Sequence, residues 1–298
     1  MRTLRTVAEL RRMVRSARSG QSRVGLVPTM GALHGGHLSL IRAARSECDL
    51  VVVSLFVNPA QFNESSDLER YPRDERRDAE LASDAGADVL FAPSVEEVYP
   101  AGFATTVEVL GLTDVLEGEV RGSEHFRGVT TVVTKLFGMV TPDVAYFGQK
   151  DAQQLAVIRR LVADLDLPVE LVTVPTARDS DGLALSSRNA LLDAEARERA
   201  SGLWAGLDAA RRLHERGETS AAELLRVAGE VLLERGIEPD YVALVDAETF
   251  QPLVSLDRDA VLAVAARVGG VRLIDNLPLT PAENRSNPKR EAVVTCSA

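Results

Sequence analysis

Cysteine is scarce in this chain: the 298 residues include two, Cys48 and Cys296. Their separation excludes the closely spaced cysteine pairs of redox and structural metal motifs. Two unpaired thiols fit a reducing compartment, and we expect Cys48 in the core and Cys296 exposed near the end of the chain.

Long hydrophobic runs are also missing. No apolar stretch approaches the roughly 18 residues of a membrane-spanning helix, and residues 1–5 lack the apolar core of a signal peptide. Residues 6–18 have the pattern of an amphipathic helix, but Glu9 and the acid-rich remainder argue against a mitochondrial presequence. We therefore expect a soluble, cytoplasmic protein.

Basic residues are fewer than acidic ones: the chain has 34 Lys and Arg and 44 Asp and Glu, which gives a net charge of −10. This balance excludes a general electrostatic attraction for nucleic acid, although a local basic patch can still bind a small polyanion. The chain does have the length for two modest domains, and 45% hydrophobic residues for their cores.

Apolar, strand-like runs alternate with helical patterns through the first two thirds of the sequence. The expected strands are 23–28, 50–56, 88–91, 143–147 and 169–174, and the expected helices are 36–46, 73–86, 126–140 and 151–164. This alternation predicts an α/β fold with a doubly wound parallel sheet. Ligands of such sheets bind outside the carboxyl ends of the strands, which is where the polar motifs of this chain fall.

The pattern changes after residue 176. Two helices are expected at 193–216 and 219–235, followed by short strands at 241–245, 260–265 and 271–274. We therefore predict a first domain over 1–176 and a smaller α+β domain over 177–280. Residues 281–298 lack periodicity and are expected to form a mobile tail.

Two of the four histidines lie in one turn, His34-Gly35-Gly36-His37, between an expected strand and an expected helix. The glycines let the backbone approach a ligand, and the helix start offers free N–H groups and a positive dipole end. Histidines at i and i+3 share one face and can donate hydrogen bonds to phosphate. The turn therefore predicts a nucleotide-phosphate site. The alternatives are one core and one surface histidine, or a metal site that lacks an obvious third ligand.

Two further segments place a cation beside polar groups. Gly148-Gln149-Lys150-Asp151 puts a lysine at a strand-to-helix turn, where the helix start already favours anions. The alternative is an ordinary helix start with a surface lysine. Ser186-Ser187-Arg188 offers two hydroxyls and a guanidinium that suit a polyphosphate. The alternative is an ordinary loop and helix cap, with Asn189 or Asp193 as the N-cap.

Polar residues also follow the second expected strand. Asn58-Pro59-Ala60-Gln61 supplies neutral donors and acceptors for a small polar substrate, unless it is simply a turn with Asn before Pro. The segment from Tyr71 to Asp78 opens a helix rich in acids, whose carboxylates could hold Mg²⁺ through water. Such charges more often form a solvated helix face.

The order of these motifs resembles one family, the pantothenate synthetases (pantoate–β-alanine ligases). The similar segments, in chain order, are 28–37, 56–62, 71–73, 125–129, 147–151 and 185–189. The resemblance runs from residue 1 to near residue 280. The looser pairing of an HxGH motif with a Ser/Arg loop is shared by the wider nucleotidyltransferase superfamily.

The resemblance implies a Rossmann-like N-terminal domain that binds ATP and pantoate, a smaller C-terminal lid, and a homodimer. It implies ATP, (R)-pantoate and β-alanine as substrates, with Mg²⁺. The expected reaction passes through a pantoyl-adenylate and gives pantothenate, AMP and diphosphate, on the route to coenzyme A.

The resemblance also assigns catalytic and nucleotide-binding residues by position. His37 would act as proton donor and His34 would hold phosphate, and the catalytic set would be His37, His34, Lys150 and Arg188. The ATP site would comprise Met30, Gly31, Ala32, Leu33, His34, Gly35, Gly36, His37, Gly148, Gln149, Lys150, Asp151, Ala177, Leu185, Ser186, Ser187 and Arg188.

The remaining substrate contacts are assigned in the same way. Gln61 would hold both pantoate and β-alanine, and Gln154 would hold pantoate. Val132 and Val133 would line the apolar side of the pantoate pocket, and Asp78 would be the metal ligand.

The chain departs from the family pattern at four places. Gln149 stands where Glu is usual, and Leu185 where Met is frequent. The segment 121–125 is longer than the Arg-Pro-Gly-His that is usual at this place in the family. Arg77, beside Asp78, occupies a position where an acidic residue is frequent.

Two other functions remain open. The first is an adenylyltransferase whose product retains AMP, and Gln61, Gln154 and the lack of an extra basic phosphate pocket argue against it. The second is a nucleotide-binding regulator without chemistry, and the intact catalytic set argues against it. A tRNA synthetase is disfavoured by the acidic balance and by the absence of an anticodon-binding domain.

Overall fold

The computed structural model describes residues 1–62 and 65–281. The predicted tail from residue 282 onward and Cys296 lie outside the described residues. The chain divides into two compact units, each with its own sheet. The first unit contains residues 1–62, 65–148 and 157–174, and the second contains 149–156 and 175–281. The binding and lid roles expected of the two domains stay predictions.

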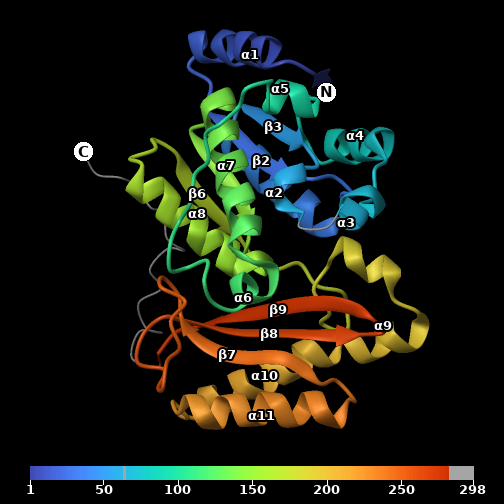
Figure 1. Ribbon diagram of the computed structural model, residues 1–298, viewed down its shortest axis with the longest axis vertical. Helices are drawn as coiled ribbons and strands as arrows, with labels where there is room; N and C mark the ends of the chain where they lie inside the picture. The colour runs from blue at the N-terminus through green and yellow to red at the C-terminus, as the bar shows by residue number, and fades with distance from the viewer. Residues whose placement is uncertain (63–64, 282–298) are drawn as a thin grey trace. The chain divides into compact units, whose positions relative to one another are not determined.

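The first unit is built on a parallel sheet with the strand order β1-β4-β3-β2-β5-β6. Figure 1 labels β2, β3 and β6 of this sheet. The strands are β1 (Arg2–Leu4), β2 (Val24–Thr29), β3 (Leu50–Leu55), β4 (Val89–Phe91), β5 (Val144–Gly148) and β6 (Glu170–Val174). The expected strands agree with β2 to β6 within one residue at each end. The pattern did not predict β1, a three-residue strand that pairs with β4.

The helices that follow these strands confirm the expected alternation. They are α1 (Val7–Ser19), α2 (Gly35–Glu47), α3 (Ser65–Arg70), α4 (Glu75–Asp84), α5 (Val95–Val98), α6 (Glu117–Arg121), α7 (Ser123–Val140) and α8 (Ala152–Asp164). Short 3-10 turns, η1 (Pro59–Gln61) and η2 (Gln149–Asp151), also follow strands. The helical periodicity did not reveal α3, α5 or α6, which are only four to six residues long.

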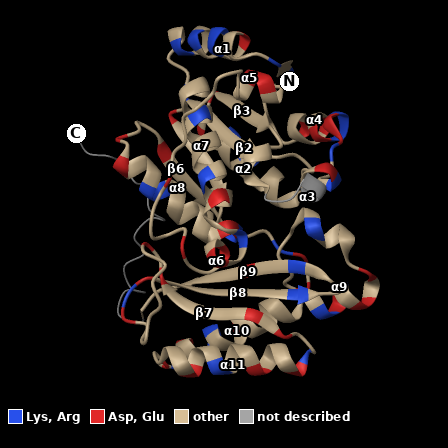
Figure 2. Ribbon diagram, in the orientation of Figure 1, with Lys and Arg blue, Asp and Glu red and all other residues tan. Residues whose placement is uncertain are grey.

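The strands form a sheet because their apolar residues are buried on both faces. Val51 and Val53 of β3 pack in one core cluster with residues of α2 and α4. Val52 points to the opposite face and is also fully buried. Figure 2 shows β2 and β3 without charged residues, whereas α1 and α4 carry Lys, Arg, Asp and Glu. A parallel sheet covered on both faces is the predicted α/β architecture, which is confirmed.

The strand order places a topological switch beside β2. The chain builds outward from β2 to β3 and β4 on one side, and through β5 and β6 on the other. In open α/β sheets, ligands bind at such a point, outside the carboxyl ends of the strands. Here the carboxyl end of β2 leads to the histidine turn, and that of β5 is Gly148.

The second unit has an antiparallel sheet in the order β7-β8-β9. Its elements are η3 (Ser187–Leu191), α9 (Ala194–Ala200), α10 (Gly202–Glu215), α11 (Ala221–Glu234), β7 (Pro239–Asp246), β8 (Ala260–Val268) and β9 (Val271–Leu279). Leu207 of α10, Leu224 of α11 and Leu262 of β8 lie in one buried cluster. The expected α+β character is confirmed, and the helix expected over 193–216 is interrupted at Ser201.

Among the described residues, no helix is long and apolar enough to cross a membrane.

Candidate active site

The turn after β2 brings two histidine rings together at the start of α2. Their ring centroids are 4.2 Å apart, as the i, i+3 spacing predicts. His34 is the N-cap residue, and its Nδ1 accepts a hydrogen bond from the Gly36 N–H at 3.2 Å. Nδ1 of His37 accepts from the His34 N–H at 3.4 Å. A neutral ring whose Nδ1 accepts carries its proton at Nε2, so this geometry makes both Nε2 atoms donors suited to phosphate oxygens.

The backbone before the histidines is held in an unusual conformation. Gly31 and Ala32 have φ values of +93° and +52°, in the left-handed region that disfavours a residue with a Cβ such as Ala32. Asp78 of α4, which is 2% exposed, stabilises this conformation. Its Oδ2 accepts from the Ala32 N–H at 2.9 Å, and its Oδ1 accepts from the Leu33 N–H at 2.8 Å. The carboxylate thus fixes the turn that carries the histidines.

These contacts also test Asp78 as the metal ligand that the sequence predicts. Both carboxylate oxygens face N–H donors, whereas Mg²⁺ binds through several oxygen ligands and water. Within residues 1–62 and 65–281, no three His, Cys, Asp or Glu side chains gather in a way that could hold a metal ion. The donor set therefore does not fit a resident Mg²⁺, and Asp78 as a metal ligand stays a prediction.

We expect Asp78→Asn to weaken ATP binding about tenfold and to lower the free energy of unfolding by about 2 kcal/mol. The amide has one accepting oxygen in place of two, so one buried N–H loses its acceptor. Titration calorimetry with ATP, in EDTA and in excess Mg²⁺, and urea unfolding measure the two effects.

The matched control is Asp74→Asn, because Asp74 is the exposed N-cap of the same helix and Asn caps as well as Asp. We expect the loss of ATP affinity in Asp78→Asn to be the same with and without Mg²⁺. A loss confined to the Mg²⁺ titration would show instead that Asp78 binds the metal.

The turn η1 is held in place by a buried asparagine. Asn58 is fully buried; its Nδ2 donates to the Gly128 carbonyl at 3.0 Å, and its Oδ1 accepts from the Ala60 N–H at 3.3 Å. The same Oδ1 accepts from the Tyr99 hydroxyl at 3.0 Å, and burial raises the pKa of Tyr99 to about 12. These contacts account for the Asn58 side chain, so the turn alternative applies to this residue.

Gln61, the predicted substrate residue of this turn, lies against α7. A Cβ on Gly128 of α7 would lie 2.2 Å from the Ala60 carbonyl oxygen, so the helix and the turn meet where only glycine fits. Nδ1 of His125 donates to the Gln61 carbonyl at 2.8 Å. Val132 and Val133, predicted to line the pantoate pocket, are buried on the same helix.

The segment around Arg121, which departs from the family pattern, is helical. Residues Glu117–Arg121 form α6, and the Arg121 guanidinium lies 2.8 Å from the Glu117 carboxylate. Gly122, at a φ of +78°, separates α6 from α7.

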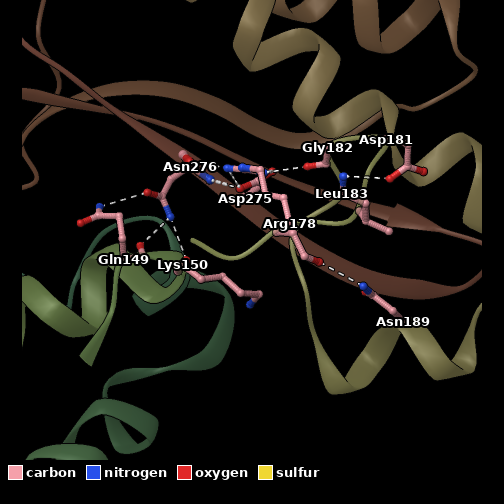
Figure 3. A network of polar contacts seen from close by, with 10 residues as sticks. Gln149, Lys150, Arg178, Asp181, Gly182, Leu183, Asn189, Asp275 and Asn276 are labelled. Carbon is pink, nitrogen blue, oxygen red and sulfur yellow. Dashed lines mark hydrogen bonds and ion pairs between the residues drawn. The ribbon is translucent and has the colours of Figure 1, made fainter. Parts of the chain in front are cut away.

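The second unit holds Lys150 on the turn η2. The Lys150 side chain is 17% exposed, and its Nζ lies 3.6 Å from the Asp151 carboxylate. Asn276 of β9 binds the backbone of this turn: its Nδ2 donates to the carbonyls of Gln149 and Lys150 at 3.0 and 2.8 Å. Its Oδ1 accepts from Gln149 Nε2 at 3.1 Å (Figure 3). The predicted pantoate residue Gln154 is half-buried in the first turn of α8.

The loop that carries the other predicted ATP residues folds back on itself. The Leu185 N–H donates to the Ala177 carbonyl at 2.9 Å, so these two residues lie side by side. Ser186 caps η3, because its hydroxyl accepts from the Arg188 N–H at 3.2 Å. Arg188 is exposed, and Ser186 and Arg188 as ATP contacts stay predictions.

The motifs alone do not reveal three buried or half-buried residues of the second unit: Arg178, Asp275 and Asn276. Arg178 binds Asp275 through both its terminal nitrogens, at 2.6 and 2.9 Å. Burial raises the pKa of the Asp275 carboxyl, and the hydrogen bonds and charge of Arg178 oppose that shift. The one sequence signal was a pair of polar residues, Asp275-Asn276, inside an otherwise mostly apolar strand.

Comparison with known proteins agrees with these observations. The family model for pantoate-beta-alanine ligase matches residues 2–278. The pantothenate synthetase of Moorella thermoacetica is 53% identical over 280 residues, which are 94% of this chain and 99% of that protein. Pantothenate synthetase 1 of Bradyrhizobium diazoefficiens is also 53% identical, over 281 residues, with 94% and 99% of the chains covered.

Solved structures show the same similarity. The crystal structure of pantothenate synthetase from Thermus thermophilus has a TM-score of 0.88 and 51% identity, covering 94% of this chain and all of that one. The pantoate-beta-alanine ligase of Francisella tularensis, complexed with beta-gamma ATP and beta-alanine, has a TM-score of 0.76 and 34% identity, covering 93% and 97%. With nearly the whole chain matched in sequence and in fold, this protein belongs to the pantoate–β-alanine ligase family.

Proposed function

We propose that this protein joins (R)-pantoate to β-alanine in an ATP-dependent reaction that passes through a pantoyl-adenylate and releases AMP and diphosphate. The observation that carries the proposal is the pair of histidines at the start of α2, beside the topological switch of the sheet. Their Nε2 donors and the helix start suit the phosphates of ATP. The complex of the Francisella tularensis relative with beta-gamma ATP and beta-alanine supports the choice of substrates.

The first step activates the pantoate carboxylate. An unactivated carboxylate is a poor acceptor for an amine, because its oxide is a poor leaving group. A carboxylate oxygen attacks the α-phosphorus of ATP, forms an O–P bond, and breaks the bond to diphosphate. Negative charge grows on the phosphorus oxygens and on the leaving group. In this proposal His34, His37 and Lys150, with the Ser186–Arg188 loop, stabilise that charge.

The second step forms the amide. The neutral amine of β-alanine attacks the acyl carbon, the bond to AMP breaks, and the amine gives up a proton. An alkyl ammonium has a pKa of about 10.4, so the site must favour the neutral amine. Gln61 would orient β-alanine, and His37 would supply the proton-transfer group. Exclusion of water protects the adenylate from hydrolysis.

Magnesium enters this proposal as part of the MgATP substrate, because both carboxylate oxygens of Asp78 accept from backbone N–H groups. The homodimer implied by the family resemblance and the cytoplasmic location expected from the sequence also remain part of the proposal, and sedimentation analysis of the purified chain tests the dimer.

The direct test follows products with ATP and Mg²⁺ present. We expect AMP to accumulate only when both pantoate and β-alanine are added, in equal amounts with pantothenate. We also expect labelled diphosphate to exchange into ATP with pantoate alone, because the adenylate forms before β-alanine reacts.

The other open functions give different results in the same assay. A product that retains AMP would identify an adenylyltransferase. ATP binding without turnover of any substrate combination would identify a regulator. Either result would overturn the proposed ligase.

A further inference from the structure

Two adjacent polar residues of β9 are buried without lying in any of the predicted binding motifs. Asp275 and Asn276 are 2% and 4% exposed, although their strand is otherwise mostly apolar. Burial of a carboxylate or an amide is costly unless its hydrogen bonds are satisfied. The contacts of both side chains therefore indicate what each residue holds in place.

Asp275 holds the loop that contains Ala177 and Leu185. Its carboxylate receives both terminal nitrogens of Arg178, and the ion pair is nearly closed to solvent, with side chains 16% and 1% exposed. Arg178 also donates to the Gly182 carbonyl at 3.0 Å, and its guanidinium lies 3.9 Å from the centroid of the Trp204 ring. Arg178 is thus fixed by an ion pair, a loop carbonyl and an aromatic face.

Asn276 holds the turn that presents Lys150. Its amide donates to two successive carbonyls, those of Gln149 and Lys150, and accepts from the Gln149 side chain. Two donors on consecutive carbonyls set both the position and the rotation of the turn. Figure 3 shows that the Arg178–Asp275 pair and the Asn276 contacts form one continuous network. The Asn276 carbonyl closes it by accepting from Arg178 at 3.2 Å.

We propose that Asp275 and Asn276 are positioning residues for the nucleotide site. They anchor the Lys150 turn and the 177–188 loop to the same strand, β9. The inference rests on the proposed function, because it takes Lys150 and this loop to bind ATP. Neither residue is assigned a contact with substrate. Each acts through a segment that it holds.

The expected cost of losing the network is kinetic. A displacement of about 1 Å at a positioned group can lower a rate about a hundredfold. Without the Asn276 amide, the carbonyls of Gln149 and Lys150 lose their donors and the turn can rotate on its flanking bonds. The Lys150 ammonium then no longer reaches one fixed place.

The test compares Asn276→Ala and Asn276→Asp with wild type. The aspartate keeps the size of the side chain but turns acceptor oxygens toward two carbonyls. We expect both variants to lower kcat for pantoate-dependent diphosphate release about thirtyfold and to weaken ATP binding about tenfold, while the KM for pantoate changes less than about twofold. Arg226→Ala, which removes an exposed ion pair of α11, is the control and should change none of these values.

A double mutant separates positioning from general damage. If Asn276 acts through Lys150, adding Asn276→Ala to Lys150→Ala should weaken ATP binding no further than Lys150→Ala alone. Additive losses, or equal losses for ATP and pantoate, would overturn the role of Asn276.

Trp204 is the one tryptophan of the chain, so its fluorescence reports on Arg178 directly. We expect Asp275→Asn to shift the Trp204 emission and to weaken ATP binding about tenfold. A neutral amide cannot form the two-pronged ion pair that the Asp275 carboxylate forms with Arg178. A shifted emission with unchanged ATP affinity would overturn the role of Asp275. If wild type binds ATP but makes no pantothenate, the proposed reaction fails while these ATP affinities still decide the positioning role.

Discussion

Lys150→Ala should lower pantoate-dependent release of diphosphate about a thousandfold, the scale seen when a donor to a developing oxyanion is removed. The Lys150 ammonium is largely shielded from water and stands on a turn whose backbone is fixed. A charge held this way needs no reorganisation when negative charge grows on the phosphate oxygens. Its ion-pair partner Asp151 is about half exposed, so losing that pair should cost little stability.

The measurement is single-turnover diphosphate release at saturating ATP and pantoate. Arg160→Ala is the control: it removes an exposed cation from α8, the helix that follows Lys150, and should leave the rate within about twofold of wild type. A Lys150→Ala rate close to wild type would remove Lys150 from the catalytic set.

His37→Ala should lower the same rate about a hundredfold or more, on the scale of a lost general acid–base group. The companion variant His37→Gln separates two roles, because a glutamine Nε2 can replace the imidazole Nε2 as a hydrogen-bond donor but cannot transfer a proton at neutral pH. If His37 transfers a proton, we expect Gln to be no better than Ala. Recovery with Gln to within about tenfold of wild type would leave His37 only a phosphate donor.

His34 needs a different substitution because its ring also caps α2. In His34→Asn, the amide oxygen can take the place of Nδ1 and accept from the Gly36 N–H, so the helix start is kept while the Nε2 donor is lost. We expect a rate about tenfold or more below wild type with an unchanged melting temperature. A lower melting temperature would show that the cap was not preserved.

The long elements of the fold could be predicted because each carries its own signal. The strand β3 is almost entirely apolar, and the helices α7 and α8 repeat apolar residues on one face, so their bounds follow from local pattern. The strand β1 has three residues and exists because β4 offers an edge to pair with. Nothing in residues 2–4 alone carries that information.

The site was predictable only in part, for the same reason. The histidine turn and the Lys150 turn are local motifs at strand ends. The contacts that hold them join distant residues: Asp78 reaches Leu33 across 45 positions, and Arg178 reaches Asp275 across 97. Such pairs have no periodicity that a single sequence can show. The acids at 74–78 accordingly looked like a solvated face or a metal site, whereas the fold turns Asp78 inward to the backbone.

Because an imidazole caps α2, a substitution of His34 that stabilises the helix is expected to lower the proposed activity. Ser, Thr, Asp and Asn cap helices well, so replacing His34 by one of them can preserve or strengthen the helix while removing the proposed phosphate donor. Selection for thermal resistance alone would then favour less active chains at this position. Engineering for heat tolerance should therefore hold His34 constant and seek its gains elsewhere, on exposed helix surfaces such as those of α10 and α11.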